Sequence, residues 1–415
     1  MKALQRICFT IIITVGLQIL LQTHSVFALP QFSLMTGNRC LTCHVNAQGG
    51  GIRSELGWYA AKDAGMINPK DVPLLKDLYA LDGESNSFID GQLTIGMDLR
   101  GQMTRSPARD NAQRRFFPMQ LALYGALKLN GAEWLTLEGG FDAASLWQSA
   151  RGSYSGQSGW TASALIQPGL TLPLLRVGHF QPTTGVRYDD HTMLIRQISG
   201  AFSRPLIPPM YAEWGAEIQY DGLQWLSLSA GAFLPQNISA INVPFANGDF
   251  GSIIAGISPE APLNQLLSAP TFTGRAKVWL RTEDHLLNSY LGASVLNNGN
   301  FRMLNAFVGA GLTDRLSLMG EYMTANLPNA FLLQNWTVEL TYRPFAWLYP
   351  YVRYEQGRSQ IYDGSTTPTN NYANNLTIGV QWFPLPYLEL RPEWRLYDTE
   401  RFTSTRWNLQ VHFFY

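Results

Sequence analysis

Apolar and polar residues alternate with a period of two along most of the chain from Phe88 onward. In the first such stretch the two faces differ in polarity: Leu93, Ile95, Met97, Leu99 and Met103 lie on one, and Asp98, Arg100 and Gln102 on the other. Successive side chains of a strand point to opposite faces, whereas a helix repeats every 3.6 residues. The pattern therefore predicts strands with one apolar face.

Sixteen segments show this alternation, and short turns between them mostly alternate with longer links. They are 88–105, 114–130, 133–148, 159–168, 171–181, 211–220, 223–234, 271–282, 286–297, 301–312, 315–326, 333–344, 347–358, 373–384, 387–398 and 404–415. Outer-membrane barrels have short periplasmic turns and long external loops. A soluble sandwich would instead carry a polar outer face. We therefore expect an all-β fold, an outer-membrane antiparallel β-barrel of about 16 strands.

Composition agrees with a barrel in the outer membrane of a Gram-negative bacterium. Charged residues make up only 14%, and the chain has 37 Gly, 12 Trp and 18 Tyr. The ending Phe413-Phe414-Tyr415 resembles the terminal aromatic signal of bacterial outer-membrane barrels. The formal net charge is zero, so nothing indicates a nucleic-acid partner. We expect contact with membrane lipid, and both termini on the periplasmic or luminal side.

Residues 1–28 read as a secretory signal peptide. Lys2 and Arg6 precede an apolar run from Ile7 to Leu21, and Val26-Phe27-Ala28 supplies small residues for cleavage. The alternative, an uncleaved anchor, is disfavoured because a spanning helix needs ~20 apolar residues and this run is shorter.

Between the signal and the barrel lies a small module, residues 29–87. Ser54 is placed to cap a helix that runs to about Ala64, and Asp71 to cap a second one that ends before Gly83. A segment of this length buries little core unaided. We therefore expect it inside the lumen of the barrel formed by residues 88–415.

The module contains Cys40-Leu41-Thr42-Cys43-His44, a C-x-x-C-H motif. In this spacing two thiols can add to the vinyl groups of one haem, and the histidine ligates the iron. A redox pair would need a thioredoxin-like context and a zinc site a second pair of ligands, and neither is visible. The only other cysteine, Cys8, lies in the signal peptide. The motif predicts one covalently attached haem c, with His44 as the proximal ligand.

The distal ligand of that haem is open. Met66 is the first thioether after the predicted helix, and Met35 stands just before the motif. His191 and His412 are barrel histidines that could approach the iron. Thioether ligation would raise the reduction potential. The iron could also be open or bound to water.

A predicted external loop, 182–210, is long enough to indicate function. It resembles porin loops that fold inward and constrict the pore, and it contains Asp189, Asp190 and His191. Two carboxylates beside an imidazole suit transient contact with ferrous iron. An ordinary solvated loop with turn-capping aspartates is the alternative.

Arginine outnumbers lysine 24 to 6. Arg100, Arg353 and Arg395 fall on lumen-facing positions of predicted strands. Such side chains can pair with acidic neighbours across the lumen, or neutralise haem propionates.

The segment around the motif resembles the fused monohaem cytochrome–porins, the outer-membrane iron-oxidase type. The matching residues are Ala28, Pro30, Phe32, Thr36 and Gly37, followed by Cys40, Cys43 and His44. The order of a haem module before a barrel also matches. Two stretches depart from the family pattern: Ser33-Leu34-Met35 replaces Ala-Arg-Gln, and residues 45–53 are glycine-rich. The resemblance implies electron transfer through the outer membrane, and the departures fit a neighbouring clade.

The expected function is transfer of electrons between an extracellular donor, ferrous iron first, and a periplasmic electron carrier. That activity would be of the oxidoreductase type. Two alternatives stay open: outward delivery of electrons to an extracellular acceptor, and a solute porin whose haem module is a plug.

Overall fold

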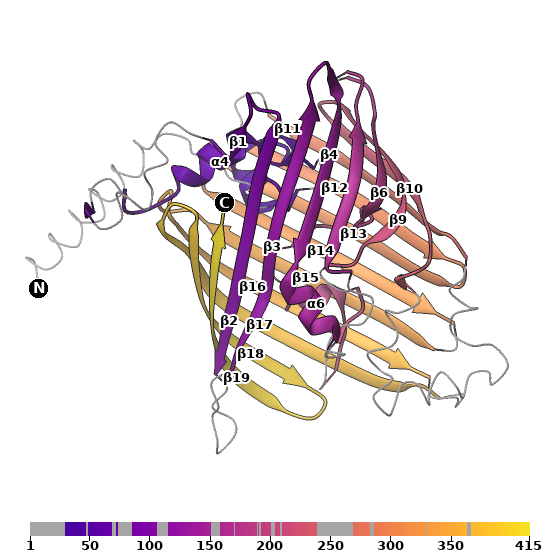
Figure 1. Ribbon diagram of the computed structural model, residues 1–415. Coiled ribbons are helices and arrows are strands. Elements are labelled where there is room, and N and C mark those ends of the chain that lie inside the picture. The colour runs from indigo at the N-terminus through magenta and orange to yellow at the C-terminus, as the bar shows by residue number, and fades with distance from the viewer. Residues whose placement is uncertain are drawn as a thin grey trace, which may run out of the picture.

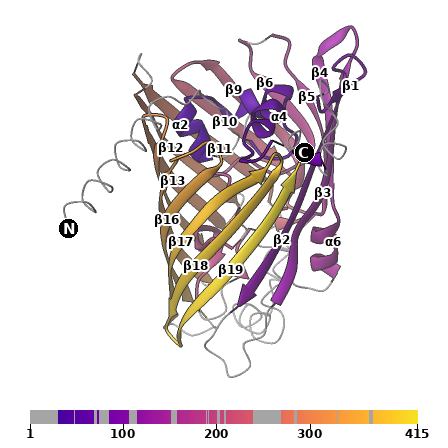
Figure 2. The same cartoon turned by 90° about the vertical axis from the view of Figure 1, so that its left-hand side faces the viewer.

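A computed structural model gives the fold as a barrel with the N-terminal helices at one end (Figures 1 and 2). The structure describes residues 30–46, 49–68, 72–73, 85–105, 115–150, 158–169, 171–188, 190, 192–200, 204–207, 210–238, 269–282, 286–328, 330–362 and 367–415. The predicted signal peptide, 1–28, lies outside them, as do Asp189 and His191.

Sixteen antiparallel strands among the described residues form a closed ring. They are β2 Leu93–Arg105, β3 Arg115–Leu129, β4 Ala132–Asp142, β5 Trp160–Ile166, β6 Leu174–Phe180, β9 Glu213–Leu223, β10 Leu226–Phe233, β11 Thr271–Arg281, β12 Leu287–Asn298, β13 Phe301–Leu312, β14 Leu316–Leu327, β15 Phe331–Tyr342, β16 Leu348–Ile361, β17 Thr369–Leu385, β18 Leu388–Thr399 and β19 Thr403–Phe414. Each pairs with the next along the chain, and β19 pairs with β2 to close the ring. Every predicted segment falls on one of these strands, so the predicted barrel is confirmed.

The strands expose their apolar face outward. On β13, Leu304 and Val308 are exposed, whereas Met303, Asn305 and Phe307 are buried in the interior. A closed barrel with an apolar outer face is typical of proteins that contact membrane lipid through strands. The same alternation turns Asp98, Arg353 and other charged side chains toward the lumen, where they are buried.

Two predicted strand ends are wrong by five residues or more, and the others agree within four residues. Residues 143–148 belong to helix α6, Ala143–Ala150, because the Asp142 carboxylate accepts hydrogen bonds from the Ala144 and Ser145 amides and starts a helix there. The first long strand begins at Leu93 rather than at residue 88. A two-residue strand, β1 Ser87–Phe88, is followed by a turn in which Ile89 and Asp90 have positive φ.

The small module contains three helices among the described residues: α2 Pro30–Thr36, α3 Cys40–Cys43 and α4 Glu55–Lys62. Ser54 caps α4 as predicted, and its hydroxyl accepts from the Gly57 amide at 3.2 Å. The second predicted helix lies outside the described residues except for Val72 and Pro73. Within the described part of the chain, no helix is both long and apolar enough to cross a membrane.

These helices lie in the barrel mouth, at the end that also holds the C-terminus (Figure 2). A Cβ on Gly311 of β13 would lie only 2.1 Å from the carbonyl oxygen of Leu34, so only glycine permits this close approach. The Asn288 side-chain amide donates to the same oxygen at 3.1 Å. Trp58 of α4 packs against Tyr387 and Tyr415, with ring centroids 5.3 and 5.9 Å away. The module is therefore docked on the lumen side of the wall.

The chain between β6 and β9 folds into the lumen. We call the described residues of 181–200 the inward segment; it includes the short helix η2 Leu194–Arg196 and the strand β7 Gln197–Ile198, which pairs with β8 Arg204–Pro205. The barrel wall holds it through many strands. Glu355 of β16 accepts from the Leu194 amide at 2.8 Å, and Asn335 of β15 donates to the Gln197 carbonyl at 2.7 Å. The predicted inward fold of this loop is confirmed.

Candidate functional site

The C-x-x-C-H motif occupies one helical turn and the start of a hairpin. Cys40 and Cys43 are at the two ends of α3, so both thiols belong to a single turn. His44 follows in an extended conformation and pairs with Arg53 in an antiparallel bridge. The Ser54 amide donates to the Cys43 carbonyl at 3.0 Å, which closes this hairpin at its base.

The glycine run after the motif forms the hairpin tip. Gly49, Gly50 and Gly51 have φ values of 79°, 72° and 65°, a left-handed backbone that other residues adopt at a cost of roughly 1–2 kcal/mol each. Gly49 lies against the motif, since a Cβ there would be 3.6 Å from the Cys40 sulfur and 3.8 Å from His44 Cδ2. The glycine-rich sequence of residues 45–53 therefore matches the backbone conformation of this turn.

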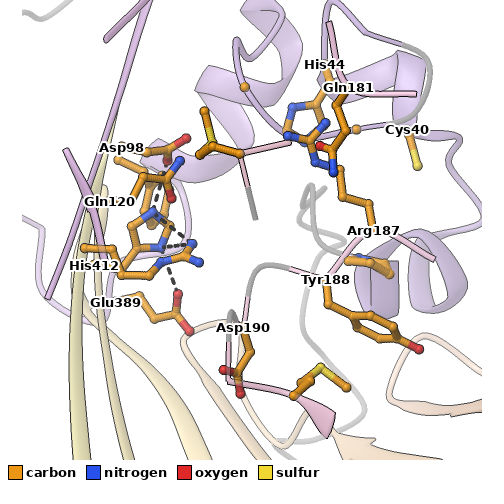
Figure 3. A pocket seen from close by; sticks show the side chains of 18 of the residues that line it. Cys40, His44, Asp98, Gln120, Gln181, Arg187, Tyr188, Asp190, Glu389 and His412 are labelled. Atoms are coloured by element: carbon orange, nitrogen blue, oxygen red, sulfur yellow. Dashed lines mark hydrogen bonds and ion pairs between the residues drawn. The ribbon is translucent and has the colours of Figure 1, made fainter. Parts of the chain in front are cut away.

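A cavity of about 1370 Å³, which includes space open to the lumen, adjoins the motif (Figure 3). Three parts of the chain line it: the motif with Cys40 and His44, the inward segment with Arg187, and the wall with Glu389 and His412. Phe32, Ala61, Phe383, Phe414 and Ile195 add apolar surface. Apolar walls with a few polar groups are typical of cofactor sites.

Two of the three motif residues, Cys40 and His44, are placed where they could hold a group in the cavity. Cys40 and Cys43 are both free thiols, and Cys40, but not Cys43, is among the described residues that line the cavity. Cys43 is 1% exposed. Burial, and then the nearby Cys40, raise the pKa of the Cys43 thiol to about 11. Cys40 and His44 open onto the cavity, where the macrocycle would find apolar contacts.

Across the cavity from His44, three side chains form a buried chain on the wall (Figure 3). His412 Nε2 lies 3.0 Å from an Asp98 oxygen, and His412 Nδ1 lies 3.2 Å from a Glu389 oxygen. Both ring nitrogens therefore face carboxylates rather than the cavity centre. This geometry disfavours His412 as the distal ligand.

The other predicted distal ligands lie elsewhere. Met66 is 40% exposed, and its amide donates to the Phe383 carbonyl at the barrel rim. Met35 is packed with Phe32 and Trp58 in an apolar cluster. Neither is among the described residues that line the cavity. His191 lies outside the described residues.

Two thioethers that the sequence did not single out, Met193 and Met210, do line the cavity. Isolated methionines in a loop carry no sequence signal that separates ligands from packing residues. Only the inward fold of the chain between β6 and β9 brings them to the motif.

Asp190, predicted as part of an external iron contact, is buried inside the barrel. Its carboxylate lies 2.6 Å from Arg353 and 3.2 Å from Arg395. Burial alone raises the pKa of Asp190, but Arg353, Arg395 and Arg391 outweigh that effect and hold it well below 3.8. Asp189 and His191 lie outside the described residues, which contain no cluster of three or more His, Cys, Asp or Glu suited to a metal ion. The three-residue iron contact therefore stays a prediction, and Asp190 itself is engaged by two guanidinium groups.

The predicted lumen arginines Arg100, Arg353 and Arg395 are all buried on the inner face. Arg353 lies 3.4 Å from oxygens of both Glu339 and Glu355, and Arg395 lies 2.5 Å from Glu393. Pairing with acidic neighbours is thus confirmed for Arg353 and Arg395. Arg100 instead lies 3.2 Å from His412.

No protein-family model and no curated protein matches the chain. Among solved structures, it is similar to OprB of Pseudomonas putida, determined at high pH, with a TM-score of 0.51 and 13% identity over 83% of this chain and 97% of that one. It is also similar to OmpF of Salmonella typhi in complex with daunomycin, with a TM-score of 0.50 and 13% identity over 79% of this chain and 99% of that one. At this identity the similarity concerns the fold. The chain has the fold of the outer-membrane porins, and the predicted outer-membrane location is confirmed.

Proposed function

We propose that the protein carries electrons through the outer membrane by means of one haem c attached to Cys40 and Cys43 and ligated by His44. The observation that carries this proposal is the position of the motif: Cys40 and His44 open onto a large cavity inside a membrane barrel. A lipid membrane is an insulator, so a redox centre held inside a barrel provides a route for electrons without solute passage.

The chain's own residues would hold and shield the group. The two thiols would fix it to α3, and the Gly49–Gly51 turn packs beside them, with Gly49 against Cys40 and Gly50 against Arg187. Phe383, Phe414 and Ile195 would give the group apolar contacts. When bound, haem supplies a one-electron couple. A ferrous ion that donates one electron leaves as a ferric ion, and an oxidised periplasmic carrier accepts that electron.

The test is a spectro-electrochemical titration of the purified full-length protein in detergent, followed by anaerobic addition of ferrous iron. We expect a covalent c-type spectrum that ferrous iron reduces rapidly. The Cys40→Ser/Cys43→Ser double variant should lose the covalent spectrum and keep the barrel, as judged by circular dichroism. A haem that ferrous iron cannot reduce would favour outward delivery of electrons. Absence of covalent haem would contradict the proposal.

The two thiols give a second test on protein prepared without haem. Cys40 is partly exposed, whereas Cys43 is buried and its pKa is raised to about 11. Because the thiolate is the nucleophile, iodoacetamide at pH 8 should label Cys40 much faster than Cys43. In haem-loaded protein both thiols should resist labelling. Equal labelling of both in the two preparations would contradict attachment at this motif.

A second candidate function is that of a solute porin whose module is a plug, and the porin fold favours it. The two functions differ in conductance. Planar-bilayer recording should find little ion flow through the intact chain if electrons are the cargo, because the module and the inward segment both lie in the lumen. Steady conductance comparable to that of an open porin would favour solute transport.

A further inference from the structure

A second, smaller cavity of about 360 Å³, including space open to the lumen, lies beside the module hairpin. Arg187 and Arg196 of the inward segment and Arg275 of β11 line it, together with the amide side chains of Asn46 and Gln181. No carboxylate is among its described lining residues. We call it the arginine pocket.

The arginines of this pocket differ from those on the neighbouring wall. Arg353, Arg391 and Arg395 each have a carboxylate oxygen within 3.2 Å. Neither Arg187 nor Arg196 lies within 4.0 Å of a carboxylate oxygen of any described residue. Arg196 donates to the backbone carbonyls of Thr184 and Val186, and Arg275 donates to that of Gly185. One carboxylate outside the pocket lining, that of Glu321, acts electrostatically on both Arg196 and Arg275, so the three guanidinium groups of the pocket remain in excess. Converging positive charges away from bulk water are costly unless an anion joins them.

Arg187 is held in this place by the glycine turn. A Cβ at Gly50 would lie 2.4 Å from Arg187 Nε and 2.6 Å from its Cζ, so the guanidinium rests where another residue would have a side chain. Figure 3 shows Arg187 extending toward His44. The arginine pocket thus adjoins the C-x-x-C-H motif, because Asn46, which lines the pocket, is only two residues after His44.

We propose that the arginine pocket binds an oxyanion, a carboxylate or a phosphate. Guanidinium groups bind both through paired, charge-assisted hydrogen bonds. The oxyanion has two possible sources: a propionate of the attached haem, which rests on the proposed function, or a free solute anion, which does not.

The experiment compares the full-length protein with its Arg187→Gln variant, because Arg187 lines the pocket and also packs against Gly50 beside the motif. The control is Arg358→Gln, an exposed arginine on the outer face of β16. Two quantities are measured: the haem reduction potential, and calorimetric binding of inorganic phosphate. Phosphate binding is also measured on Cys40→Ser/Cys43→Ser, which lacks the attachment site.

If propionate is the ligand, Arg187→Gln should favour the oxidised haem by about threefold to tenfold, and tenfold equals 59 mV for one electron. Phosphate should then bind only to Cys40→Ser/Cys43→Ser, and adding Arg187→Gln to it should weaken that binding at least about tenfold. If a solute anion is the ligand, the wild-type chain binds phosphate, and Arg187→Gln weakens binding at an unchanged potential.

Different results would refute the proposed electron-transfer function and the proposed anion site. A chain without covalent haem that binds phosphate through Arg187 would refute the proposed function and keep the anion site. Unchanged potential and unchanged phosphate binding in Arg187→Gln would overturn the anion site. An equal effect of Arg358→Gln would overturn it as well, since the effect would then be one of net charge.

Discussion

The inward segment contains two charged residues close together in the chain, Asp190 and Arg187, and the charges that surround them differ. Asp190 is locked between Arg353 and Arg395, so its charge is matched by the wall. Arg187 faces a pocket with two further arginines and no described carboxylate. Paired buried charges fix a segment in position, whereas a pocket with an excess of positive charge suits an anionic ligand. The contrast separates charged residues that hold the inward segment against the wall from charged residues that line a possible ligand site.

Asp190→Asn should have the largest effect on stability. It removes one carboxylate from Arg353 and Arg395, which keep Glu339, Glu355 and Glu393 as partners. Losing a buried hydrogen bond between charged groups costs about 1.5–3 kcal/mol. Urea unfolding in detergent, followed by tryptophan fluorescence, measures the loss, and limited proteolysis of the inward segment locates it. A loss below about 1 kcal/mol would mean that the pairs are not fully buried.

The same contact should respond to acid. The folded pKa of Asp190 is held well below its ordinary value of 3.8. A depressed carboxyl pKa adds stability that is fully present above the unfolded value and is lost as pH falls through the folded value. The inward segment should therefore stay protease-resistant at pH 5 and become sensitive only below pH 3.8, when probed with pepsin. Asp190→Asn should remove this pH dependence.

Gly50→Ala should have an intermediate effect. The left-handed backbone at Gly50 costs alanine about 1–2 kcal/mol, and the new Cβ would also push Arg187 away. Gly91→Ala is the matched control, because Gly91 has φ +81 but nothing within 4 Å of its Cβ position. Both variants should lose similar stability in urea. Only Gly50→Ala should also weaken the anion site, and equal effects there would contradict the packing of Arg187 on Gly50.

The smallest effect on stability is expected for Arg187→Gln. With no carboxylate partner to leave behind among the described residues, it should change the free energy of unfolding by less than about 0.5 kcal/mol. Arg395→Gln, which strips Asp190 and Glu393 of a partner, should cost several times more. Comparable losses in the two variants would erase the distinction between matched and unmatched arginines.

The barrel itself was predictable because the period of two is a local property of the chain. The lumen positions of Arg353 and Arg395 followed from the same alternation. The Ser54 cap was readable since a capping hydroxyl and the amide it accepts from are three residues apart. Helix α6 was not, because Leu146 and Trp147 continue an apolar pattern while the Asp142 cap redirects the backbone.

The candidate site was predictable only where its residues are adjacent. Cys40, Cys43 and His44 form one motif, but its surroundings come from distant parts of the chain. Met193 and Arg187 reach it because the chain after β6 folds inward, and Asp190 is drawn to Arg353, 163 residues away. Such contacts depend on tertiary structure, which local pattern does not record.

The lumen-facing glycines carry a further consequence. Gly311 admits the Leu34 backbone, and Gly357 admits Ser199, whose Oγ would be 1.7 Å from a Cβ there. Glycine is a poor strand former, so its presence on the inner face of long strands marks where something else must touch the wall. The sequence of the wall therefore records, at these two positions, where the module and the inward segment contact it. In other barrels whose sequences show no motif for a segment inside the lumen, glycines on the inner face would indicate which barrels contain such a segment.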